Sequence, residues 1–396
     1  MKYVVITSLF RPLSRGGAEV VVEDIVDELK KEHEVHVITT RSWSGVKSLS
    51  LAFSQENGII IERFYPLNIF SFIDINTKPY IMRMIWHLFD IFNLHSYAVV
   101  LEYLKKTKPD CVFTHNLKGI GYLIPFAIKH ASIRHIHTLH DIQLAVPTGL
   151  LYRKKEYEEK NIQNRFHTWC SRMLFGSPSV VVCPSQFLKT FYEQRRFFPH
   201  SRYVVLANPI CGVHGKENFK TQRDIQNTFI RFFFAGTLNE AKGILLLCRT
   251  FTELQNEHIQ LVIAGSGPDE SKVKEYCERD KRIVFLGRLS HDGLLETLRG
   301  MHYTIVPSLC YENAPTIIPE SFSFGIPVIA SNIGGTAESI KDNVNGFICA
   351  PGDSSALKHA LNRAIHCKGY PQLCKAAKES MQGRDCAPYI RRLIQM

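Results

Sequence analysis

The stretch Lys2–Thr40, KYVVITSLFRPLSRGGAEVVVEDIVDELKKEHEVHVITT, alternates between two kinds of hydrophobic pattern. Its ends, KYVVITS and HEVHVITT, are short runs rich in β-branched residues, which favour strands. Between them, AEVVVEDIVDELKKE has the apolar spacing of a helix that packs on one face. This order predicts two parallel strands joined by a crossover helix.

The same alternation continues along the chain and restarts once. The further strands expected in the first half are DCVFTHN, IRHIHTLHD and SVVVCPS, and those in the second half are IRFFFAGT, IQLVIAGSG, RIVFLGRL, YTIVPSL and IPVIASN. Between the two series, residues 208–227 are polar and rich in turn formers, which is typical of a linker. The sequence therefore predicts two doubly wound α/β domains, residues 1–208 and 209–377, with ligands bound at the carboxyl ends of the strands and in a shared cleft.

Composition agrees with this organisation, because a chain of 396 residues with 45% hydrophobic and 21% charged residues usually divides into two cores. The net charge of +11 is concentrated in the first half: residues 1–212 hold 26 Lys and Arg against 18 Asp and Glu, whereas residues 213–396 hold 22 against 19. This excess favours an anionic partner or an anionic membrane surface for the first half. We expect no nucleic acid partner.

The cysteines and the chain start indicate the compartment. Eleven cysteines are present without a C-x-x-C pair, so we expect reduced thiols in a cytosolic protein. The opening MKYVVITSLF lacks a small-residue cleavage site and is expected to be a strand. No apolar run approaches the length of a membrane span, so the expected location is the cytoplasm, with peripheral contact at the inner face of the membrane as an option.

Two carboxylates frame the stretch Tyr311–Glu320, YENAPTIIPE. We expect a helix with Thr316 as its N-cap that runs to Phe324 and stops at Gly325. Glu312 would then lie in the loop facing the cleft, and Glu320 in the early helix beside backbone N–H groups that can hold a phosphate. A carboxylate there can accept both hydroxyls of a ribose. The alternative is a pair of solvated glutamates beside an ordinary helix.

Two further segments can meet an anion. Lys242, in FFAGTLNEAKGI, follows a strand end and can reach a diphosphate as a point charge, although it could equally be a solvated loop lysine. In SRGGAE, Gly16 and Gly17 would let backbone amides approach an anion at a helix start. Neither SRGGAE nor GSGPDE completes G-x-G-x-x-G, so nicotinamide binding has little support.

Histidines at strand ends are the candidates for hydrogen bonding to a sugar. His140, in HTLHD, can donate to a sugar hydroxyl or to a leaving oxygen, and Asp141 can fix its tautomer or meet an acceptor. His115, in FTHNLKG, is a weaker candidate. Both histidines could instead be satisfied core or loop residues. The sequence holds neither D-x-D nor H-E-x-x-H, so a bound metal is not indicated.

These motifs together resemble the retaining glycosyltransferases of family 4. The pair Glu312-x7-Glu320 is followed by SFSFGIPVIASNIGGTAESIKDNVNGFICAPGD, and GGAE, HEVHVIT, PDCVFTHN, TLHD, LANPI, AGTLNEAKG, VIAGSGP and FLGRLS occur in that family's order. The resemblance implies a GT-B fold, a nucleotide-sugar donor held by the second domain and an acceptor held by the first. It also implies no cofactor or metal, and a final helix, about 378–396, that packs back on the first domain.

The resemblance also assigns roles to single residues. Glu312, His140 and Lys242 would serve the reaction, with Glu312 on the sugar hydroxyls, His140 near the reacting sugar and Lys242 on the diphosphate. The remaining donor contacts would be Glu320 on the ribose, Gly16 and Gly17 on the β-phosphate, Leu289 beside the base, and the segment Asn313, Ala314, Pro315 and Thr316 on the diphosphate. Asp141 and His115 would lie on the acceptor side.

One position departs from the family pattern. Thr237 stands in GTL where the family usually has an arginine that binds phosphate. Losing one preorganised donor at a comparable site costs about 10²–10³ in rate. Either another cation, for which Arg288 is a candidate, replaces the arginine, or activity is weakened.

The stretch Lys78–Asn93, KPYIMRMIWHLFDIFN, is unusually apolar for a helix. Its polar residues Arg83, His87, Asp90 and Asn93 form one narrow stripe, and the rest is hydrophobic. We expect a buried helix, and the alternative is an interfacial surface that meets a lipid-linked acceptor.

The sequence thus favours a retaining transferase that moves a hexose from a UDP- or GDP-sugar to a glycan or lipid-linked acceptor in cell-surface polysaccharide or lipopolysaccharide synthesis. Two alternatives stay open. A non-catalytic module that binds nucleotide sugars would explain Thr237. A GT-B sugar-nucleotide epimerase would need acid and base groups at the sugar C2, which the spacing of Glu312 and Glu320 does not supply.

Overall fold

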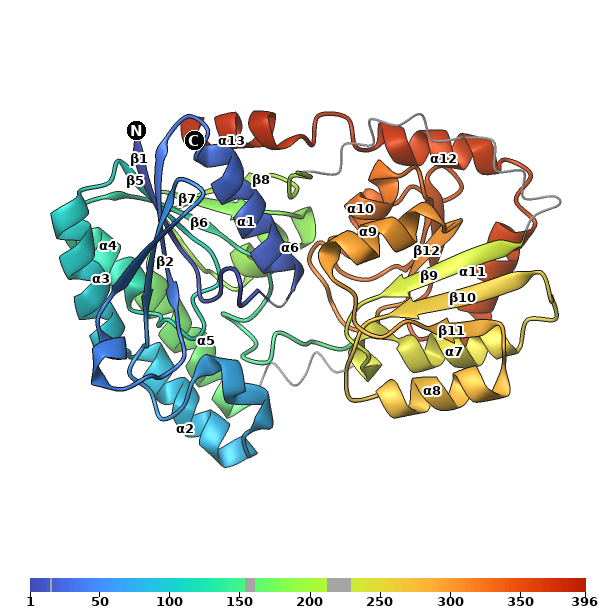
Figure 1. The fold of residues 1–396 in the computed structure, drawn as a ribbon, viewed down its shortest axis with the longest axis horizontal. Helices are drawn as coiled ribbons and strands as arrows, with labels where there is room; N and C mark the ends of the chain where they lie inside the picture. The colour runs from blue at the N-terminus through green and yellow to red at the C-terminus, as the bar shows by residue number, and fades with distance from the viewer. Residues whose placement is uncertain (15, 154–160, 212–228) are drawn as a thin grey trace. The chain divides into compact units, whose positions relative to one another are not determined.

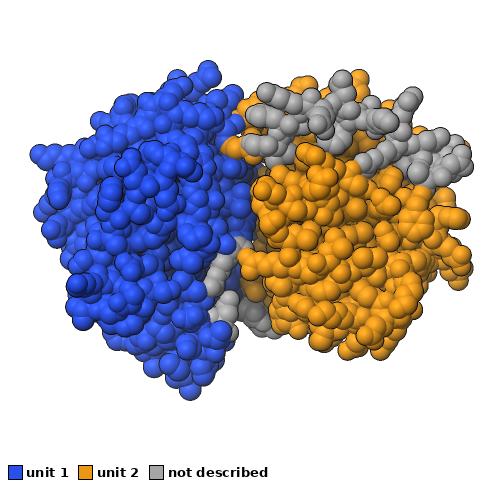
Figure 2. All heavy atoms as spheres, viewed as in Figure 1, with its two compact units in different colours: residues 1–149, 159–209, 386–396 blue, residues 150–158, 210–385 orange. Residues whose placement is uncertain are grey.

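Residues 1–14, 16–153, 161–211 and 229–396 are described by the computed structural model. They fall into two units: unit 1 is Met1–Gly149, Glu159–Pro209 and Cys386–Met396, and unit 2 is Leu150–Glu158 and Ile210–Asp385 (Figure 2). Most of the expected linker, residues 212–227, lies outside the described residues.

Unit 1 is built on an eight-stranded sheet with the order β3-β4-β2-β1-β5-β6-β7-β8. Every neighbouring pair is parallel except β3 and β4. The strands are β1 (Lys2–Ile6), β2 (Glu34–Thr40), β3 (Ala52–Glu56), β4 (Ile59–Phe64), β5 (Cys111–Thr114), β6 (Arg134–Thr138), β7 (Val180–Cys183) and β8 (Arg202–Val205).

Helices cover this sheet, and Figure 1 shows α3 and α4 on one side and α1 on the other. The α-helices of unit 1 are α1 (Gly17–Leu29), α2 (Tyr80–Ile91), α3 (Leu94–Thr107), α4 (Ile124–His130), α5 (Ile162–Phe175), α6 (Gln186–Gln194) and α13 (Cys386–Gln395), and its 3₁₀ helices include η1 (Val46–Leu49) and η2 (Phe72–Thr77). The predicted opening strand, helix and strand are therefore present as β1, α1 and β2.

The returning segment is shorter than the expected 378–396. Helix α13 packs on α1 in unit 1, where Tyr389 and Leu393 join a core with Val22 and Ile25. Residues 378–385 belong to unit 2 instead.

Cys386, at the start of α13, and Cys211 are disulfide-bonded, so the expectation that all thiols are reduced is wrong for these two, whereas the other nine cysteines are free.

The hairpin of β3 and β4 was not predicted from the sequence. Its turn is Asn57-Gly58, and both residues have positive φ angles, 51° and 82°. Asn-Gly at such a turn is the pairing that matches the twist of two antiparallel strands. Because β3 alternates between half-buried and exposed side chains, it lacks the continuous apolar run of the other strands. The Asn-Gly pair was the signal that could have found it.

Unit 2 is built on a six-stranded parallel sheet with the order β11-β10-β9-β12-β13-β14. The first strand, β9, lies in the middle, and later strands are added on either side of it, as in the doubly wound fold predicted from the sequence. The strands are β9 (Ile230–Ala235), β10 (Ile259–Ala264), β11 (Ile283–Phe285), β12 (Tyr303–Val306), β13 (Val328–Ser331) and β14 (Gly346–Cys349).

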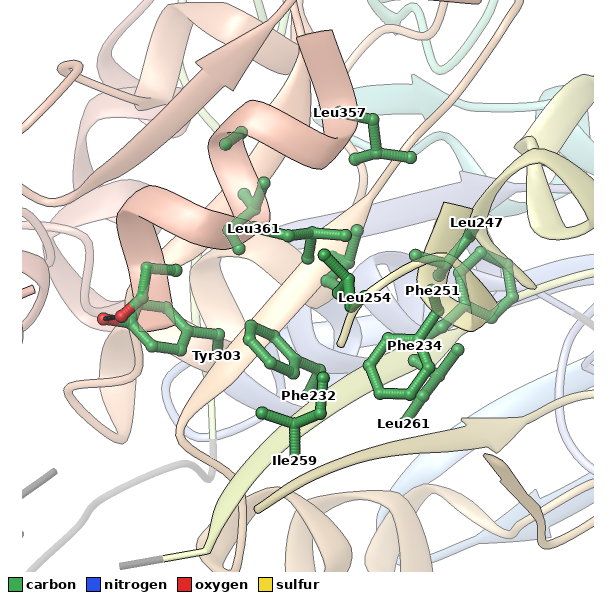
Figure 3. Close-up of a cluster of buried hydrophobic side chains, with 14 of the residues drawn as sticks. Phe232, Phe234, Leu247, Phe251, Leu254, Ile259, Leu261, Tyr303, Leu357 and Leu361 are labelled. Carbon is green, nitrogen blue, oxygen red and sulfur yellow. Dashed lines mark hydrogen bonds between the residues drawn. The ribbon is translucent and has the colours of Figure 1, made fainter. Parts of the chain in front are cut away.

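A large aromatic and aliphatic core lies under one face of this sheet (Figure 3). Phe232 and Phe234 of β9 pack there with Phe251, and Phe232 stacks on Tyr303 with ring centroids 5.6 Å apart. The helices of unit 2 are α7 (Ile244–Thr252), α8 (Glu270–Arg279), α9 (His291–Arg299), α10 (Ile317–Ser323), α11 (Ser354–Ile365) and α12 (Tyr370–Glu379), with the 3₁₀ helices η5 (Glu240–Lys242) and η6 (Thr336–Ser339). Burial of this core fixes the strands whose ends carry the candidate residues.

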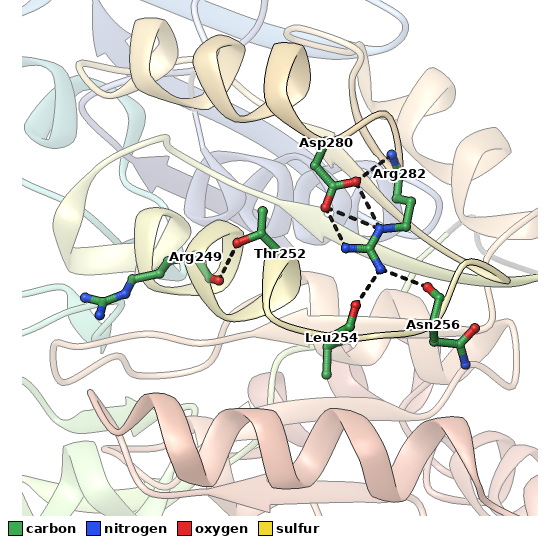
Figure 4. A network of polar contacts seen from close by, with 6 residues as sticks. All are labelled: Arg249, Thr252, Leu254, Asn256, Asp280 and Arg282. Carbon is green, nitrogen blue, oxygen red and sulfur yellow. Dashed lines mark hydrogen bonds and ion pairs between the residues drawn. The ribbon is translucent and has the colours of Figure 1, made fainter.

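Arg282 links the start of the short edge strand β11 to the rest of unit 2 by hydrogen bonds (Figure 4). Its guanidinium pairs with Asp280 at 2.7 Å and donates to the backbone oxygens of Leu254 and Asn256 at 2.6 and 2.8 Å. A planar fork of donors suits such simultaneous contacts. The loop after α7 is thereby tied to the start of β11.

Helix α2 shows the opposite of the expected burial. Its polar stripe faces inward: Asp90 is buried and both its carboxylate oxygens accept from the amide of Gly119 at 3.0 Å. Most of the apolar residues around that stripe are exposed, including Ile81 at 70%, whereas Trp86 and Ile91 are buried. The prediction of a buried helix is therefore wrong, and the physical reason is that unit 1 satisfies the polar stripe by hydrogen bonds rather than covering the apolar face.

Candidate functional site

In each unit the candidate residues follow strand ends beside the point where the strand order reverses. In unit 2, Lys242 comes after β9 and Glu312 after its neighbour β12. In unit 1, Gly16 comes after β1 and His115 after its neighbour β5. Loops diverge at such a point and leave room for a ligand at the carboxyl edge of the sheet.

Lys242 and Glu312 form an ion pair in unit 2. Nζ of Lys242 lies 2.5 Å from Oε2 of Glu312, and the hydroxyl of Ser308 donates to the other carboxylate oxygen. The Glu312 side chain is only 11% exposed, so it needs such partners. Burial opposes the charge on Lys242, but the adjacent Glu312 outweighs it and raises the pKa of the lysine. The pair therefore holds a fixed ammonium at the end of β9.

Close backbone packing fixes the position of Glu312. The amide of Gly335 donates to the Glu312 carbonyl at 2.8 Å. Gly334, with a φ of +58°, lies so near that a Cβ there would be 2.4 Å from the same carbonyl oxygen. Likewise, a Cβ on Gly243 would be 2.0 Å from the carbonyl oxygen of Pro307. The two glycines let the loops after β9 and β12 lie against their neighbours.

Glu320 lies on α10, whose limits are within one residue of the prediction: Thr316 is the N-cap, the helix ends at Ser323 rather than Phe324, and Gly325 has a φ of +65°. Its carboxylate is mostly buried, and Oε1 lies 4.0 Å from Nδ1 of His291. This neighbouring histidine was not foreseen from the sequence.

The other residues predicted to contact the nucleotide-sugar donor lie in the segment before α10 and in the loop after β11. Asn313 is buried, whereas Ala314, Pro315 and Thr316 are half-buried. Leu289 is half-buried and packs against the core beside α9.

Thr237 and Arg288 are both exposed and lie in different loops. Thr237 follows β9 and Arg288 follows β11, so β10 lies between their strands. The loops nevertheless approach each other, because a Cβ on Gly265 would be 1.9 Å from the Gly236 carbonyl oxygen and the Gly265 amide donates to Gly287 at 2.8 Å. Whether Arg288 replaces the missing arginine stays a prediction.

A segment from the first half of the sequence lies beside Glu312. Tyr152 forms an antiparallel bridge with Cys310, and the amide of Tyr311 donates to Leu151 at 2.8 Å. Sequence reasoning missed this contact because LLYR shows no strand periodicity. It brings the half-buried Tyr152 next to the loop that ends in Glu312.

Helix α1 in unit 1 begins at Gly17 with Gly16 as its N-cap, so the two glycines lie at a helix start as the sequence predicted. The amide of Gly16 donates to Oε2 of Glu19 at 2.8 Å. A carboxylate thus occupies the amide that was assigned to a phosphate. An incoming phosphate would have to displace Glu19 from that amide.

His115 and His140 meet at the ends of β5 and β6. Nδ1 of His115 lies 2.9 Å from Nε2 of His140, so one of the two rings donates to the other. Burial lowers the pKa of His140 to about 4 and that of His115 well below its usual value. Both rings are therefore neutral at pH 7. Nε2 of His115 is buried and has no hydrogen-bond partner among the residues that the structure describes.

These histidines line a small cavity within unit 1. Asp141, Lys118 and Tyr192 line it as well, and its volume of about 20 Å³ has room for one water molecule. Burial raises the pKa of Asp141 to about 6, against the lowering effects of its bond from the Gln143 amide and of Lys118. The structure brings His115, His140 and Asp141 together beside this one cavity.

A second histidine pair lies deeper in the same sheet and was not predicted. The hydroxyl of Thr114 lies 2.7 Å from Nε2 of His135 and 2.8 Å from Nδ1 of His137. The alternation in IRHIHTLHD could have shown that these two side chains share one face of β6, with Thr114 on the neighbouring strand.

Two family models match the chain: Glycosyltransferase Family 4 over residues 15–211 and Glycosyl transferases group 1 over residues 215–382. An uncharacterised glycosyltransferase of Methanocaldococcus jannaschii is 30% identical over 93% of this chain and 90% of its own. The lipopolysaccharide 1,2-N-acetylglucosaminetransferase of Salmonella typhimurium is 27% identical over 64% of this chain and 72% of its own.

Solved structures show the same architecture. Anabaena HepE in complex with UDP superposes with a TM-score of 0.71 at 19% identity, covering 100% of this chain and 99% of that one. The fold is GT-B, as the sequence predicted, and the protein is a transferase. With two family models that together span nearly its whole length and a relative that is 30% identical over 93% of it, the chain belongs to the group 1, family 4 glycosyltransferases.

Proposed function

We propose that this enzyme transfers a hexose from a UDP- or GDP-sugar to a glycan or lipid-linked acceptor in cell-surface polysaccharide or lipopolysaccharide synthesis, with retention of configuration. The similarity to the Salmonella lipopolysaccharide transferase supports the acceptor class. The UDP complex of the structural neighbour supports a nucleotide-sugar donor.

The observation that carries the proposal is the Lys242–Glu312 ion pair at the strand-order reversal of unit 2, with Glu320 on the following helix. As the donor reacts, the bond between the sugar C1 and the diphosphate breaks and negative charge grows on the leaving oxygen. A preorganised ammonium is worth most at such a developing charge. Glu312 holds that ammonium in place and can accept a sugar hydroxyl, while Glu320 can accept the ribose hydroxyls.

The acceptor hydroxyl supplies the new bond. Its oxygen attacks C1 on the face that the diphosphate leaves, and its proton passes to the departing phosphate oxygen. In this proposal a neutral His140 donates a hydrogen bond to a sugar hydroxyl, because its low pKa keeps it uncharged. Asp141, with a pKa of about 6, is mostly ionised at pH 7 and can accept from an acceptor hydroxyl.

The test is an assay of the purified chain with panels of UDP- and GDP-sugars, and with glycan and lipid-linked acceptors. We expect one nucleotide to raise the melting temperature selectively, and we expect transfer with that donor, with the product anomer assigned by NMR. Glu320→Gln should lose the thermal shift, whereas Glu275→Gln on the exposed side of α8 should keep it. Absence of binding, hydrolysis and transfer would refute the proposal, and an inverted anomer would refute retention alone.

A further inference from the structure

Two helices of unit 1 expose hydrophobic side chains where soluble proteins normally place polar ones. On α2, Ile81, Ile85 and Leu88 recur at helical spacing on the exposed side, and Phe89 beside them is exposed as well. A contiguous apolar surface of this kind marks a binding site for another surface. We call the exposed side chains of α2 and α5 the apolar face.

Helix α5 extends the apolar face. Ile162, Phe166 and Trp169 recur at the same spacing, and Ile162 is 83% exposed. The rings of Phe166 and Trp169 stack, with centroids 6.2 Å apart. The hydroxyl of Tyr80 on α2 donates to Gln163 on α5 at 3.1 Å, so the two helices are joined where the face passes from one to the other.

The charged side chains that α2 and α5 expose to solvent are all positive. Arg165 and Arg172 are exposed and lie seven residues apart on α5, so they flank the stripe of Phe166 and Trp169 on one side. Asp90 is the single acidic residue of α2 and α5, and it is buried against Gly119. An apolar face bordered by arginines is complementary to a surface that combines hydrocarbon with negative charge.

The apolar face cannot be part of a helix that crosses a membrane in this fold. By length and composition alone, residues Tyr80–Thr107 could span one, contrary to the expectation from the sequence. However, α2 and α3 are separate helices, and Asn93 between them caps α3 by accepting from the Ser96 amide at 2.9 Å. The inward side of α2 is also fastened to unit 1 through Asp90. A helix held on one side and apolar on the other suits the plane of an interface.

We propose that α2 and α5 dock unit 1 on an anionic phospholipid bilayer, with the apolar face inserted among the acyl chains and Arg165 and Arg172 on the lipid phosphates. The basic excess of residues 1–212 adds a long-range attraction toward the same surface. Docking requires neither donor nor acceptor, so it is tested separately from sugar transfer.

The experiment is co-sedimentation of the full chain with vesicles of phosphatidylcholine, with and without phosphatidylglycerol. We expect the wild type to bind the mixed vesicles, and more weakly at high salt. Leu88→Glu with Phe89→Glu should weaken binding to both vesicle types at least about tenfold, because two apolar side chains lose their burial. Arg165→Gln with Arg172→Gln should weaken binding to the anionic vesicles by roughly tenfold to thirtyfold and leave binding to neutral vesicles unchanged.

Val344→Glu, which replaces an exposed apolar residue of unit 2, is the matched control and should bind like the wild type. Because all these positions are solvent-exposed, each variant should keep the wild-type circular dichroism spectrum. The proposal would be overturned if the wild type did not bind vesicles. It would also be overturned if Val344→Glu weakened vesicle binding as much as Leu88→Glu with Phe89→Glu does. A dimer in sedimentation velocity that Leu88→Glu with Phe89→Glu abolishes, together with unchanged vesicle binding, would assign the face to a second copy of this chain instead.

Discussion

Lys242 and Glu312 lie in the segments that follow the neighbouring parallel strands β9 and β12, and their side chains meet at 2.5 Å. The sequence suggested a separate ligand contact for each. In the structure each is the partner of the other, and the ion pair compensates the charge of the largely buried Glu312. A donor would therefore meet a preformed pair rather than two independent groups.

A double-mutant cycle should reveal this coupling. Lys242→Met and Glu312→Gln should each destabilise the chain, and the cycle should give a coupling energy of about 1–3 kcal/mol in calorimetric unfolding. Lys274→Met and Glu270→Gln, which break an exposed pair on α8, form the control cycle and should give less than about 1 kcal/mol. Equal coupling in the two cycles would contradict a special role for burial. Lys242→Met should also slow transfer about 10²–10³-fold.

Glu320→Ala should weaken nucleotide binding by about 1–3 kcal/mol, because the ribose loses a charged acceptor. Isothermal titration calorimetry with UDP and GDP measures this loss. The control is Glu296→Ala on α9, whose carboxylate pairs with Arg299 on the surface. Unchanged affinity in Glu320→Ala would mean that the ribose lies elsewhere.

Thr237→Arg tests whether the diphosphate site is short of positive charge. Thr237 is exposed after β9, so an arginine can be accommodated and offers a bidentate fork to phosphate oxygens. We expect tighter binding of nucleoside diphosphates at low salt and a smaller gain at high salt. If affinity for nucleoside diphosphates does not rise at low salt, another cation of the protein already binds the diphosphate. Adding Arg288→Gln to the Thr237→Arg variant would then show whether that cation is Arg288.

Gly334→Ala should disturb the loop that carries Glu312. The added Cβ would lie 2.4 Å from the Glu312 carbonyl oxygen, in addition to the strain of a positive φ. Gly383→Ala is the matched control, because Gly383 also has a positive φ but has nothing within 4 Å of its Cβ position. We expect Gly383→Ala to cost about 1 kcal/mol and Gly334→Ala about 1–3 kcal/mol more. Equal losses in calorimetric unfolding would show that the loop yields to the methyl group.

Unit 1 should lose stability as the pH falls from about 6.5 toward 4. Burial lowers the pKa values of His135, His140 and His167 to between about 3 and 4, so in this window the unfolded chain binds protons that the folded chain does not. Each such histidine contributes a slope of up to about 1.4 kcal/mol per pH unit. Asp141 and Asp90 act in the opposite direction, because burial raises their pKa values to about 6 and about 7.

The measurement is urea unfolding followed by tryptophan fluorescence, which reports on unit 1 because Trp43, Trp86 and Trp169 all lie there. His140→Gln should make the fall in stability less steep, and Asp141→Asn should make it steeper. A free energy of unfolding that stays constant between pH 6.5 and 5, or slopes that change in the same direction in both variants, would contradict this reading of the buried groups.

Much of this architecture could be read from local sequence. Strands such as KYVVITS and IQLVIAGSG can be recognised in the sequence by runs rich in β-branched residues, because a strand that is buried on both faces has few polar side chains. The limits of α10 could be predicted to within one residue from Thr316 and Gly325, although the Thr316 side chain makes no capping hydrogen bond. The positions of His115, His140, Lys242 and Glu312 at strand ends followed from the same pattern.

What the sequence could not determine depends on which surfaces are brought together. The inward turn of Asp90 on α2, the approach of Leu151 to Tyr311 and the Lys242–Glu312 ion pair all join segments that are far apart in the chain. Helical spacing groups side chains into stripes, but only packing decides which stripe meets protein and which meets solvent. Local pattern thus determined the elements and their order, and tertiary contacts determined the partners of each charge, because the free energy of a buried polar group depends on its neighbours in space.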